Sequence, residues 1–157
     1  MRVTLAPYTP GQRDALVALA VTPEQEQFSG QPARLLDQPG DTADLHLIYD
    51  AAALVGMFRI DPQFARTHDF APAGAFGLRS VIVDRAHQGR GIGTAMIRAL
   101  PAYLMVQYPA ARQLYLTVNL RNPAARASYL RGGFHDTGAQ YLGGDAGPQH
   151  ILRLDLT

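Results

Sequence analysis

Apolar and polar positions along the chain follow two periods, that of a β-strand and that of an α-helix. Alternating stretches and short apolar runs rich in β-branched residues predict strands. The predicted strands are residues 2–6, 44–50, 53–61, 76–83, 113–118, 134–141 and 149–156. Helical spacing and helix-start signals predict helices at residues 9–20, 23–37, 91–108 and 122–132.

Capping residues mark where two of these helices begin. Thr9 is followed by Pro10 and Gln12, which combines a capping residue, a proline in the first turn and a glutamine three residues on. Asn122 before Pro123 is a second such signal. Both positions are therefore predicted helix starts.

Proline and glycine predict interruptions elsewhere. The helix at 23–37 should break near Gly30 and Pro32, and Pro101 should bend or break the helix at 91–108. Residues 65–74 read as a loop, and residues 50–52 read as the turn of a hairpin.

The order of these elements predicts the fold class. A hairpin is followed by strand, helix, strand, helix and two strands, which is typical of an α/β sandwich with a mixed sheet. The chain has 157 residues, a length that fits one domain over residues 1–157.

Composition narrows the class of protein. Hydrophobic residues make up 47% and charged residues 17%, as in a globular chain. We expect no membrane span, because no apolar run approaches the length of one, and no secretory signal at the start. Cysteine is absent, which excludes disulfides, thiolate metal sites and a cysteine nucleophile. All 14 basic residues are arginine, which excludes lysine chemistry. The cytoplasm is the expected location, and the histidine spacing predicts no metal site.

Charge is unevenly distributed along the chain, although its net value is +1. Residues 85–135 contain half of the arginines and none of the 13 acidic residues. Such a basic segment predicts a polyanionic ligand, unless the arginines are simply solvated helix faces. We do not expect a nucleic acid there, because no basic stripe interleaved with aromatic residues accompanies them.

A glycine-rich loop follows the predicted strand that ends at residue 83. The strand end is Val81, Ile82 and Val83, and the loop is Gln88, Gly89, Arg90, Gly91, Ile92, Gly93 and Thr94. Glycines let successive backbone N–H groups turn toward phosphate oxygens, and the N-terminus of the following helix adds partial positive charge. These residues suit a diphosphate. Neither a P-loop nor the dinucleotide fingerprint G-x-G-x-x-G fits the spacing.

Residues 88–93 resemble the Gln/Arg-x-x-Gly-x-Gly/Ala signature of the GCN5-related N-acetyltransferase family. The resemblance extends over residues 76–134 and implies that this loop holds the pyrophosphate of coenzyme A. It also implies a mostly antiparallel sheet in which residues 80–83 splay from residues 114–118 to admit acetyl-CoA. Backbone N–H groups of residues 81–83 would then polarise the acetyl carbonyl for direct transfer to an amine.

A second motif supports the same family. The segment from residue 114 to Phe134 is similar to the family's strand, Asn-x-x-Asn pair, helix and Gly-Phe. Asn119, Asn122 and Ala125 are thereby expected on the cofactor side, with Asn119 bonding pantetheine amides. Tyr129 lies two helical turns after Asn122, on the same face, and is the expected general acid for the departing thiolate. Its alternative role is core packing.

The sequence indicates less about the side of the site that binds the acceptor amine. The chain's two glutamates, Glu24 and Glu26, lie beside Phe28 and are candidates for the base that deprotonates a cationic amine. A solvated helical turn explains them equally well. Asp84, His87 and Asp50 are lesser candidates.

A second resemblance concerns the acceptor. Residues 21–28 and 143–150 are similar to bacterial spermine/spermidine acetyltransferases, which predicts a polyamine such as spermidine or spermine. The alternatives are a peptide N-terminus, an amino acid or an aminoglycoside, or a non-catalytic acyl-CoA-binding module. Homodimers are common in the family, so a homodimer is a further expectation, while the residues themselves do not specify an oligomeric state.

Overall fold

The computed structural model describes residues 1–36, 38, 41–144 and 146–156. Its strands are β1 Val3–Pro7, β2 Asp44–Asp50, β3 Ala53–Asp61, β4 Phe76–Val83, β5 Gln113–Asn119, β6 His135–Tyr141 and β7 Gln149–Asp155. Its α-helices are α1 Arg13–Val17, α2 Pro23–Ser29, α3 Pro32–Leu36, α4 Phe64–Thr67, α5 Ile92–Gln107 and α6 Pro123–Gly132. Short 3₁₀ turns occupy Pro10–Gln12 and Arg85–His87.

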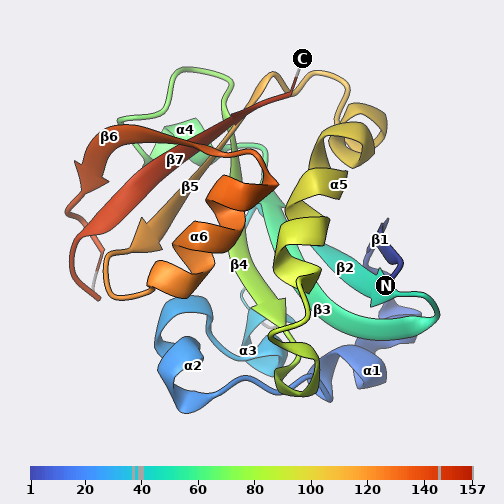
Figure 1. Cartoon of the computed structure of the whole chain (residues 1–157). Helices are drawn as coiled ribbons and strands as arrows, with labels where there is room; N and C mark the ends of the chain where they lie inside the picture. Colours follow the sequence, from blue (N-terminus) through green and yellow to red (C-terminus); the bar gives the residue numbers. More distant parts are fainter. Residues whose placement is uncertain (37, 39–40, 145, 157) are drawn as a thin grey trace.

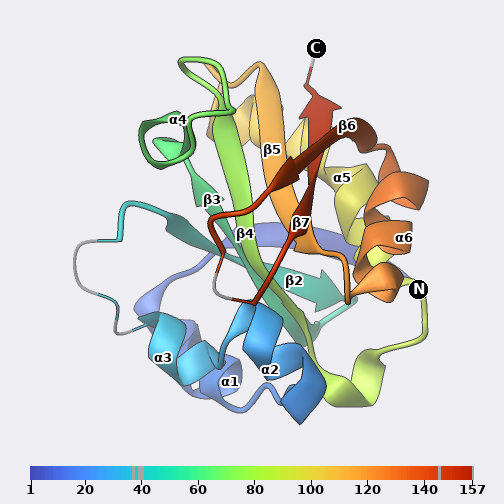
Figure 2. The ribbon, with the colours of Figure 1, turned by 90° about the vertical axis from the view of Figure 1, so that its left-hand side faces the viewer.

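All the strands belong to one seven-stranded sheet in the order β1-β2-β3-β4-β5-β7-β6. Every neighbouring pair is antiparallel except β4 and β5, which are parallel. Figure 1 shows α5 and α6 on one face of this sheet, and Figure 2 shows α1 to α4 toward the other. The predicted mixed, mostly antiparallel α/β sandwich is therefore confirmed.

Each face of the sheet has its own apolar core. On the α5 face, Met96, Ile97 and Leu100 pack with Leu78 and Leu116. On the opposite face, Leu16, Leu19 and Leu35 pack with Leu47, Met57 and Ile82, and Phe64 packs with Tyr115 and Ile151 in a separate cluster. Burial on both faces stabilises the sheet and leaves its centre open only where two strands part.

The two parallel strands part soon after they meet. Pairing between β4 and β5 is confined to Phe76 with Leu114 and Gly77 with Tyr115. Beyond these pairs β4 follows β3, and the register between β3 and β4 shifts between Met57 and Arg59. The predicted splay of β4 from β5 is thus present.

Three local features differ from the sequence-based predictions. The first helix begins with a 3₁₀ turn and ends at Val17 instead of near residue 20. The segment predicted as a loop from residue 65 contains most of α4. Pro101 lies inside α5, which is one continuous helix, so of the predicted bend or break the break is wrong. A proline removes one helical hydrogen bond, and the surrounding apolar contacts of α5 outweigh that loss.

Other predictions are confirmed at their boundaries. Gln12 Oε1 accepts a hydrogen bond from the Thr9 backbone N–H at 2.9 Å, as a capping glutamine does. The break near Gly30 separates α2 from α3, although Asp37, the predicted end of that stretch, lies outside the described residues. No helix in the described part of the chain is long and apolar enough to cross a membrane.

Candidate functional site

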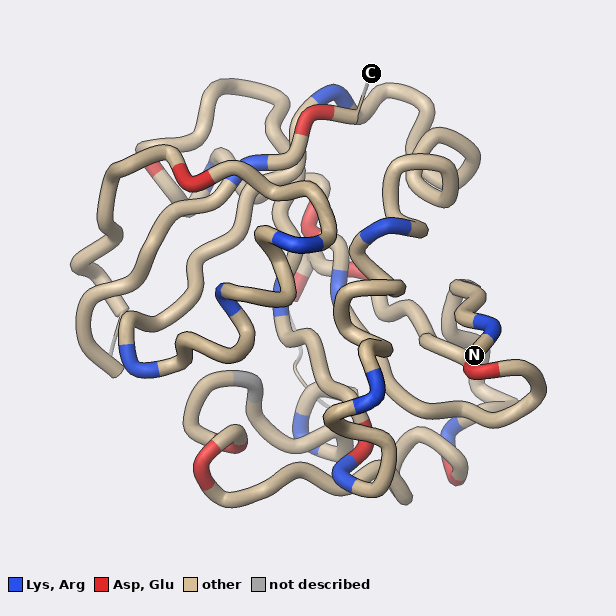
Figure 3. The backbone as a smooth tube through the Cα atoms, in the orientation of Figure 1, with Lys and Arg blue, Asp and Glu red and all other residues tan. Residues whose placement is uncertain are grey.

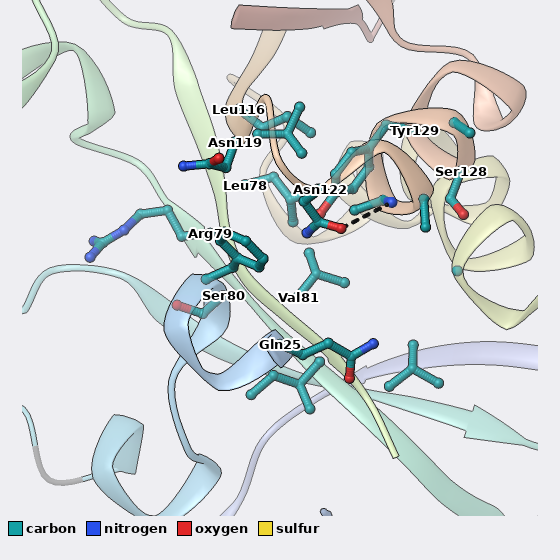
Figure 4. Close-up of a pocket in the computed structure, with 18 of the residues that line it drawn as sticks. Gln25, Leu78, Arg79, Ser80, Val81, Leu116, Asn119, Asn122, Ser128 and Tyr129 are labelled. Carbon is teal, nitrogen blue, oxygen red and sulfur yellow. Dashed lines mark hydrogen bonds between the residues drawn. The ribbon is translucent and has the colours of Figure 1, made fainter. Parts of the chain in front are cut away.

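A cavity of about 920 Å³ occupies the gap between β4 and β5. Its walls come from β4, β5, α2, α4, α5 and α6, and it therefore passes from one face of the sheet to the other. Figure 4 shows side chains of β4, β5 and α6 converging on it. The predicted cofactor residues on this wall are Val81, Ile82, Val83, Gln88, Gly89, Gly91, Ile92, Gly93, Thr94, Asn119, Asn122, Ala125 and Tyr129.

The glycine loop forms one end of the cavity. Gly89 and Gly91 have φ angles of 76° and 82°, a backbone region that residues other than glycine rarely adopt. Gly91 is also the N-cap of α5. The first N–H groups of a helix have no partner inside it, so those of residues 92–94 face the cavity end with partial positive charge. This end of the cavity can bind a diphosphate.

Two side chains of the loop have partners within the protein. The Gln88 amide donates to Gln25 Oε1 at 2.6 Å and to the Val83 carbonyl at 3.0 Å, which attaches α2 to the loop. Arg90 does not line the cavity, and it forms an ion pair with Asp50 at 3.3 Å. The Arg90 side chain is 52% exposed. In this structure the loop contributes backbone and Gln88 to the cavity, and the Arg90 guanidinium lies elsewhere.

The backbone of β4 is strained three residues after its last pair with β5. Ser80 has a φ of 55°, which is uncommon for a residue with a side chain. The Ser80 hydroxyl accepts hydrogen bonds from Arg59 Nε and Nη2 at 3.3 and 2.9 Å. Arg59 is only 4% exposed and also donates to Asp41 at 2.5 Å. These hydrogen bonds of Arg59 fix the backbone of β4 just before Val81.

The two asparagines at the β5–α6 junction have structural contacts. The Asn119 amide donates to the Ala146 carbonyl at 2.7 Å, and its oxygen accepts from the Arg121 N–H at 2.8 Å. Asn119 thus ties β5 to the β6–β7 loop, and its side chain is already engaged. Asn122 Oδ1 caps α6 by accepting from the Ala125 N–H at 3.4 Å (Figure 4).

Tyr129 projects from α6 into the cavity, toward Asn122 in Figure 4. Its ring meets Phe134 edge-on, with centroids 5.8 Å apart. Burial raises the pKa of Tyr129 to about 12, so the phenol is protonated throughout the neutral range. A protonated hydroxyl at this position can donate to a leaving group.

The glutamates of α2 do not reach the cavity. Gln25, Gln27 and Phe28 line it, whereas Glu24 and Glu26 do not, and Glu24 is exposed. Successive residues of a helix point about 100° apart, so Glu26 points away from the side of α2 that lines the cavity. Glu24 lies one turn before Phe28 on the lining side, but it is in the first turn of α2 and exposed. The side of α2 that lines the cavity therefore carries amide and aromatic side chains, and a role of Glu24 and Glu26 as bases remains a prediction from the sequence.

The lesser base candidates are also engaged. Burial alone would raise the pKa of Asp84, but hydrogen bonds from the Ala20 N–H, His87 and the Ala86 N–H lower it. His87 lines the cavity at the glycine loop and contacts Asp84 at 3.0 Å. Asp50 accepts from the Arg2 N–H at 2.9 Å and pairs with Arg90.

On the face opposite α5 and α6, the cavity wall contains residues that the sequence did not single out. Phe64 and His68 come from α4 and its end, and Arg79 comes from β4. Arg79 extends away from Tyr129 in Figure 4 and pairs with Asp41 and Asp61 at 3.1 and 3.3 Å. No sequence motif marks these residues, because each reaches the site through contacts between distant elements.

Charge over the site follows the sequence pattern. Figure 3 shows arginines and no acidic residues along α5 and α6. Arg131 lines the cavity, while Arg98 donates to the Arg131 carbonyl at 3.3 Å. In the described part of the chain, no three His, Asp or Glu side chains gather as metal ligands would.

Comparison with known proteins gives a consistent result. The model of the acetyltransferase (GNAT) family matches residues 11–134. An uncharacterized N-acetyltransferase, YbbJ, of Bacillus subtilis (strain 168) is 26% identical over 153 residues, which is 96% of this chain and 95% of that protein.

Solved structures share the fold at low identity. AAC(6')-Ib in complex with paromomycin and acetyl-CoA is 16% identical with a TM-score of 0.78, covering 99% of this chain and 94% of that one. A spermidine N-acetyltransferase SpeG chimera from Vibrio cholerae and hSSAT is also 16% identical with a TM-score of 0.70, covering 99% and 96%. At such identity these likenesses establish the fold alone.

Proposed function

Because this chain belongs to the acetyltransferase (GNAT) family, we propose that it transfers the acetyl group of acetyl-CoA to a primary amine in the cavity between β4 and β5. The chain is an acetyl-CoA-dependent N-acetyltransferase by family, and the acceptor and residue roles are our proposal. One observation supports it most: a single cavity joins the glycine loop at α5, the parted strands and Tyr129.

The donor end of the cavity fits the pyrophosphate of coenzyme A. A side chain at Gly89 or Gly91 would force a strained backbone, while glycine leaves the loop amides close to a ligand. The pantetheine arm would lie between β4 and β5, where Asn119 shapes the wall through its bond to Ala146 instead of bonding the arm itself.

The chemistry requires polarisation of the carbonyl and a proton for the thiolate. The β4 backbone at residues 81–83 lines the parted strand, and its N–H groups are the proposed donors to the carbonyl oxygen. Tyr129 is the proposed acid that protonates the sulfur as the C–S bond breaks. Transfer is direct, from thioester to amine.

We propose a polyamine as the acceptor, on the likeness of residues 21–28 and 143–150 to polyamine acetyltransferases. Phe28 lines the cavity, as a wall for an alkyl chain would, and Asp145 in the second segment lies outside the described residues. A peptide N-terminus, an amino acid and an aminoglycoside are the competing acceptors, and a non-catalytic acyl-CoA-binding module is the competing role.

An amine panel tests this proposal. Thiol release from acetyl-CoA is measured with spermidine, spermine, kanamycin, a peptide with a free N-terminus and a free amino acid. We expect the highest kcat/KM with the polyamines. A stronger signal with the peptide or kanamycin would reject the polyamine, and no release with any amine would reject the catalytic role.

Three further predictions concern the domain, the cellular location and the oligomeric state. We propose that residues 1–157 act as one acetyltransferase domain, which the continuous seven-stranded sheet supports. The cytoplasmic location and the homodimer remain predictions from the sequence.

A further inference from the structure

His68 lies beside the point where β4 and β5 part. Its ring stacks flat on Phe64, with centroids 3.9 Å apart and an angle of 7° between the planes. Phe64 in turn lies against Gly77, where an added Cβ would come within 2.1 Å of the Phe64 ring. Gly77 belongs to the last β4–β5 pair. The imidazole is therefore fixed at the apex of the splay and lines the cavity.

The hydrogen bonds of His68 determine which ring nitrogen carries the proton. Nδ1 lies 3.2 Å from the Phe64 carbonyl oxygen, which can only accept. Thr67 Oγ1, 2.9 Å from Nδ1, donates its own proton to the same carbonyl at 3.3 Å and so can only accept from the ring. Nδ1 is thus the protonated nitrogen, and Nε2 has a lone pair available to accept a proton.

The surroundings keep His68 neutral. Burial lowers the pKa of His68 below its usual 6.5, and the Arg79 charge lowers it further, while the Phe64 carbonyl and the Asp61 carboxylate oppose these effects. The Tyr141 ring of β6 lies 5.5 Å away. A neutral imidazole at pH 7 can take up a proton.

His68 and Tyr129 approach the cavity from opposite sides of the sheet. Phe64 and Tyr115 pack together on the α4 face, whereas Tyr129 packs with the α5 core. Figure 2 shows α4 and α6 on opposite sides of the sheet. An amine that enters from the α4 face would meet His68, and the thiolate would depart on the side of Tyr129. Separate sites for proton removal and donation suit a reaction in which an ammonium must lose a proton before its nitrogen attacks the thioester.

Other titratable side chains on the described cavity wall are less suited to this task. His87 lies at the glycine loop and is paired with Asp84. Glu24 and Glu26 do not line the cavity. Among the residues that the structure describes, His68 is the imidazole of the cavity wall on the α4 face.

We propose that His68 Nε2 accepts the proton of the acceptor ammonium, directly or through one water, and so produces the neutral amine that attacks the thioester. This role rests on the proposed acetyl transfer. As the N–C bond forms and the C–S bond breaks, a second proton leaves the nitrogen and replaces the one that Tyr129 gives to the sulfur. The proton on His68 then passes to solvent, so one proton is released per amide formed.

The variant His68→Asn tests this role. Asparagine retains an N–H that can bond the Phe64 carbonyl but has no base. With spermidine at pH 7 we expect kcat/KM to fall by about 10²–10⁴-fold. An amine of pKa near 10 is neutral in only about one molecule per thousand at pH 7, so without a base the variant depends on this fraction. Its rate should therefore rise about tenfold per pH unit and approach that of the wild type near pH 10.

Controls separate this proposal from folding and from the acetyltransferase assignment. His135→Gln, on the exposed edge strand β6, should retain wild-type kinetics. Acetyl-CoA binding by calorimetry and the melting temperature should be unchanged in His68→Asn. The comparison uses spermidine, or kanamycin if the wild type does not acetylate spermidine. If His68→Asn then shows no loss of kcat/KM, or a loss that does not change with pH, the role of His68 is overturned. A wild type inactive with every amine instead overturns the proposed function.

Discussion

At the scale of single residues, the environment of Tyr129 constrains how it can act. A phenol with a pKa of about 12 is a weaker acid than a thiol of pKa about 8.5, so complete proton transfer alone would cost roughly 5 kcal/mol. Loss of the second nitrogen proton in the same step removes most of this cost. Burial therefore favours a concerted donation and keeps the phenol protonated between turnovers.

Replacing the hydroxyl tests this assignment. In Tyr129→Phe the ring keeps its edge-on contact with Phe134, so acetyl-CoA affinity by calorimetry should change less than about threefold. We expect kcat to fall about 10²–10⁴-fold, the usual contribution of a positioned acid. Tyr49→Phe, on β2, is the matched control. Unchanged kcat of Tyr129→Phe between pH 6 and 9 would show that the phenol is only a packing residue.

At the scale of elements, a buried polar cluster attaches the second half of α5 to the sheet. His46 of β2 is 3% exposed, and its ring nitrogens lie 2.5 Å from the Tyr103 hydroxyl and 2.8 Å from the Tyr108 hydroxyl. Tyr108 donates to Asp44 at 2.6 Å and so accepts from His46 Nε2. Tyr103 consequently donates to Nδ1, and every member of the cluster is satisfied while His46 is neutral.

Acid should therefore loosen this attachment. Burial lowers the pKa of His46 to about 4, whereas in the unfolded chain it is near 6.5. The unfolded state binds the proton first, so the stabilisation is complete above pH 6.5 and is lost as the pH falls toward 4. The free energy of unfolding, from urea titrations, should drop by about 3 kcal/mol over this interval. His46→Gln should be less stable at pH 7, and its free energy of unfolding should fall less steeply between pH 6.5 and 4. Equal slopes for both proteins would contradict the argument.

At the scale of the whole molecule, the site is an opening in an otherwise continuous sheet. The strands β4 and β5 share only two residue pairs, so few backbone hydrogen bonds join the two halves of the sheet there. A ligand that fills the gap bridges both halves and binds the folded state alone. Acetyl-CoA should therefore stabilise the protein as well as react.

Thermal denaturation measures this effect. Acetyl-CoA at about 100 times its Kd should add about 2.7 kcal/mol and raise the melting temperature by roughly 5–10 °C. Gly91→Ala should reduce the shift, because Gly91 has a φ of 82° at the N-cap of α5. Gly11→Ala, in open space at the other end of the chain, should show the full shift. An equal shift in both variants would mean that the glycine loop does not hold the donor.

The sequence alone determined most elements and the glycine loop that forms one end of the cavity. Capping at Thr9 and Asn122, the apolar strands and the glycine loop depend on hydrogen bonds and backbone angles within a few residues, so their patterns are readable locally. The short helix at Phe64–Thr67 was missed because its stability depends on Phe64 packing against Gly77, a contact that no local pattern encodes.

Only the tertiary structure decided which side chains face the acceptor. On α2 the difference between Gln25 and Glu26 is one residue of helical phase, which the packing of the helix sets and its composition does not. His68 was unmarked in the sequence because its tautomer and position depend on Phe64 and on two strands that part nearby. A site built from elements far apart in the chain depends on how those elements pack, and that packing is a property of the folded molecule as a whole.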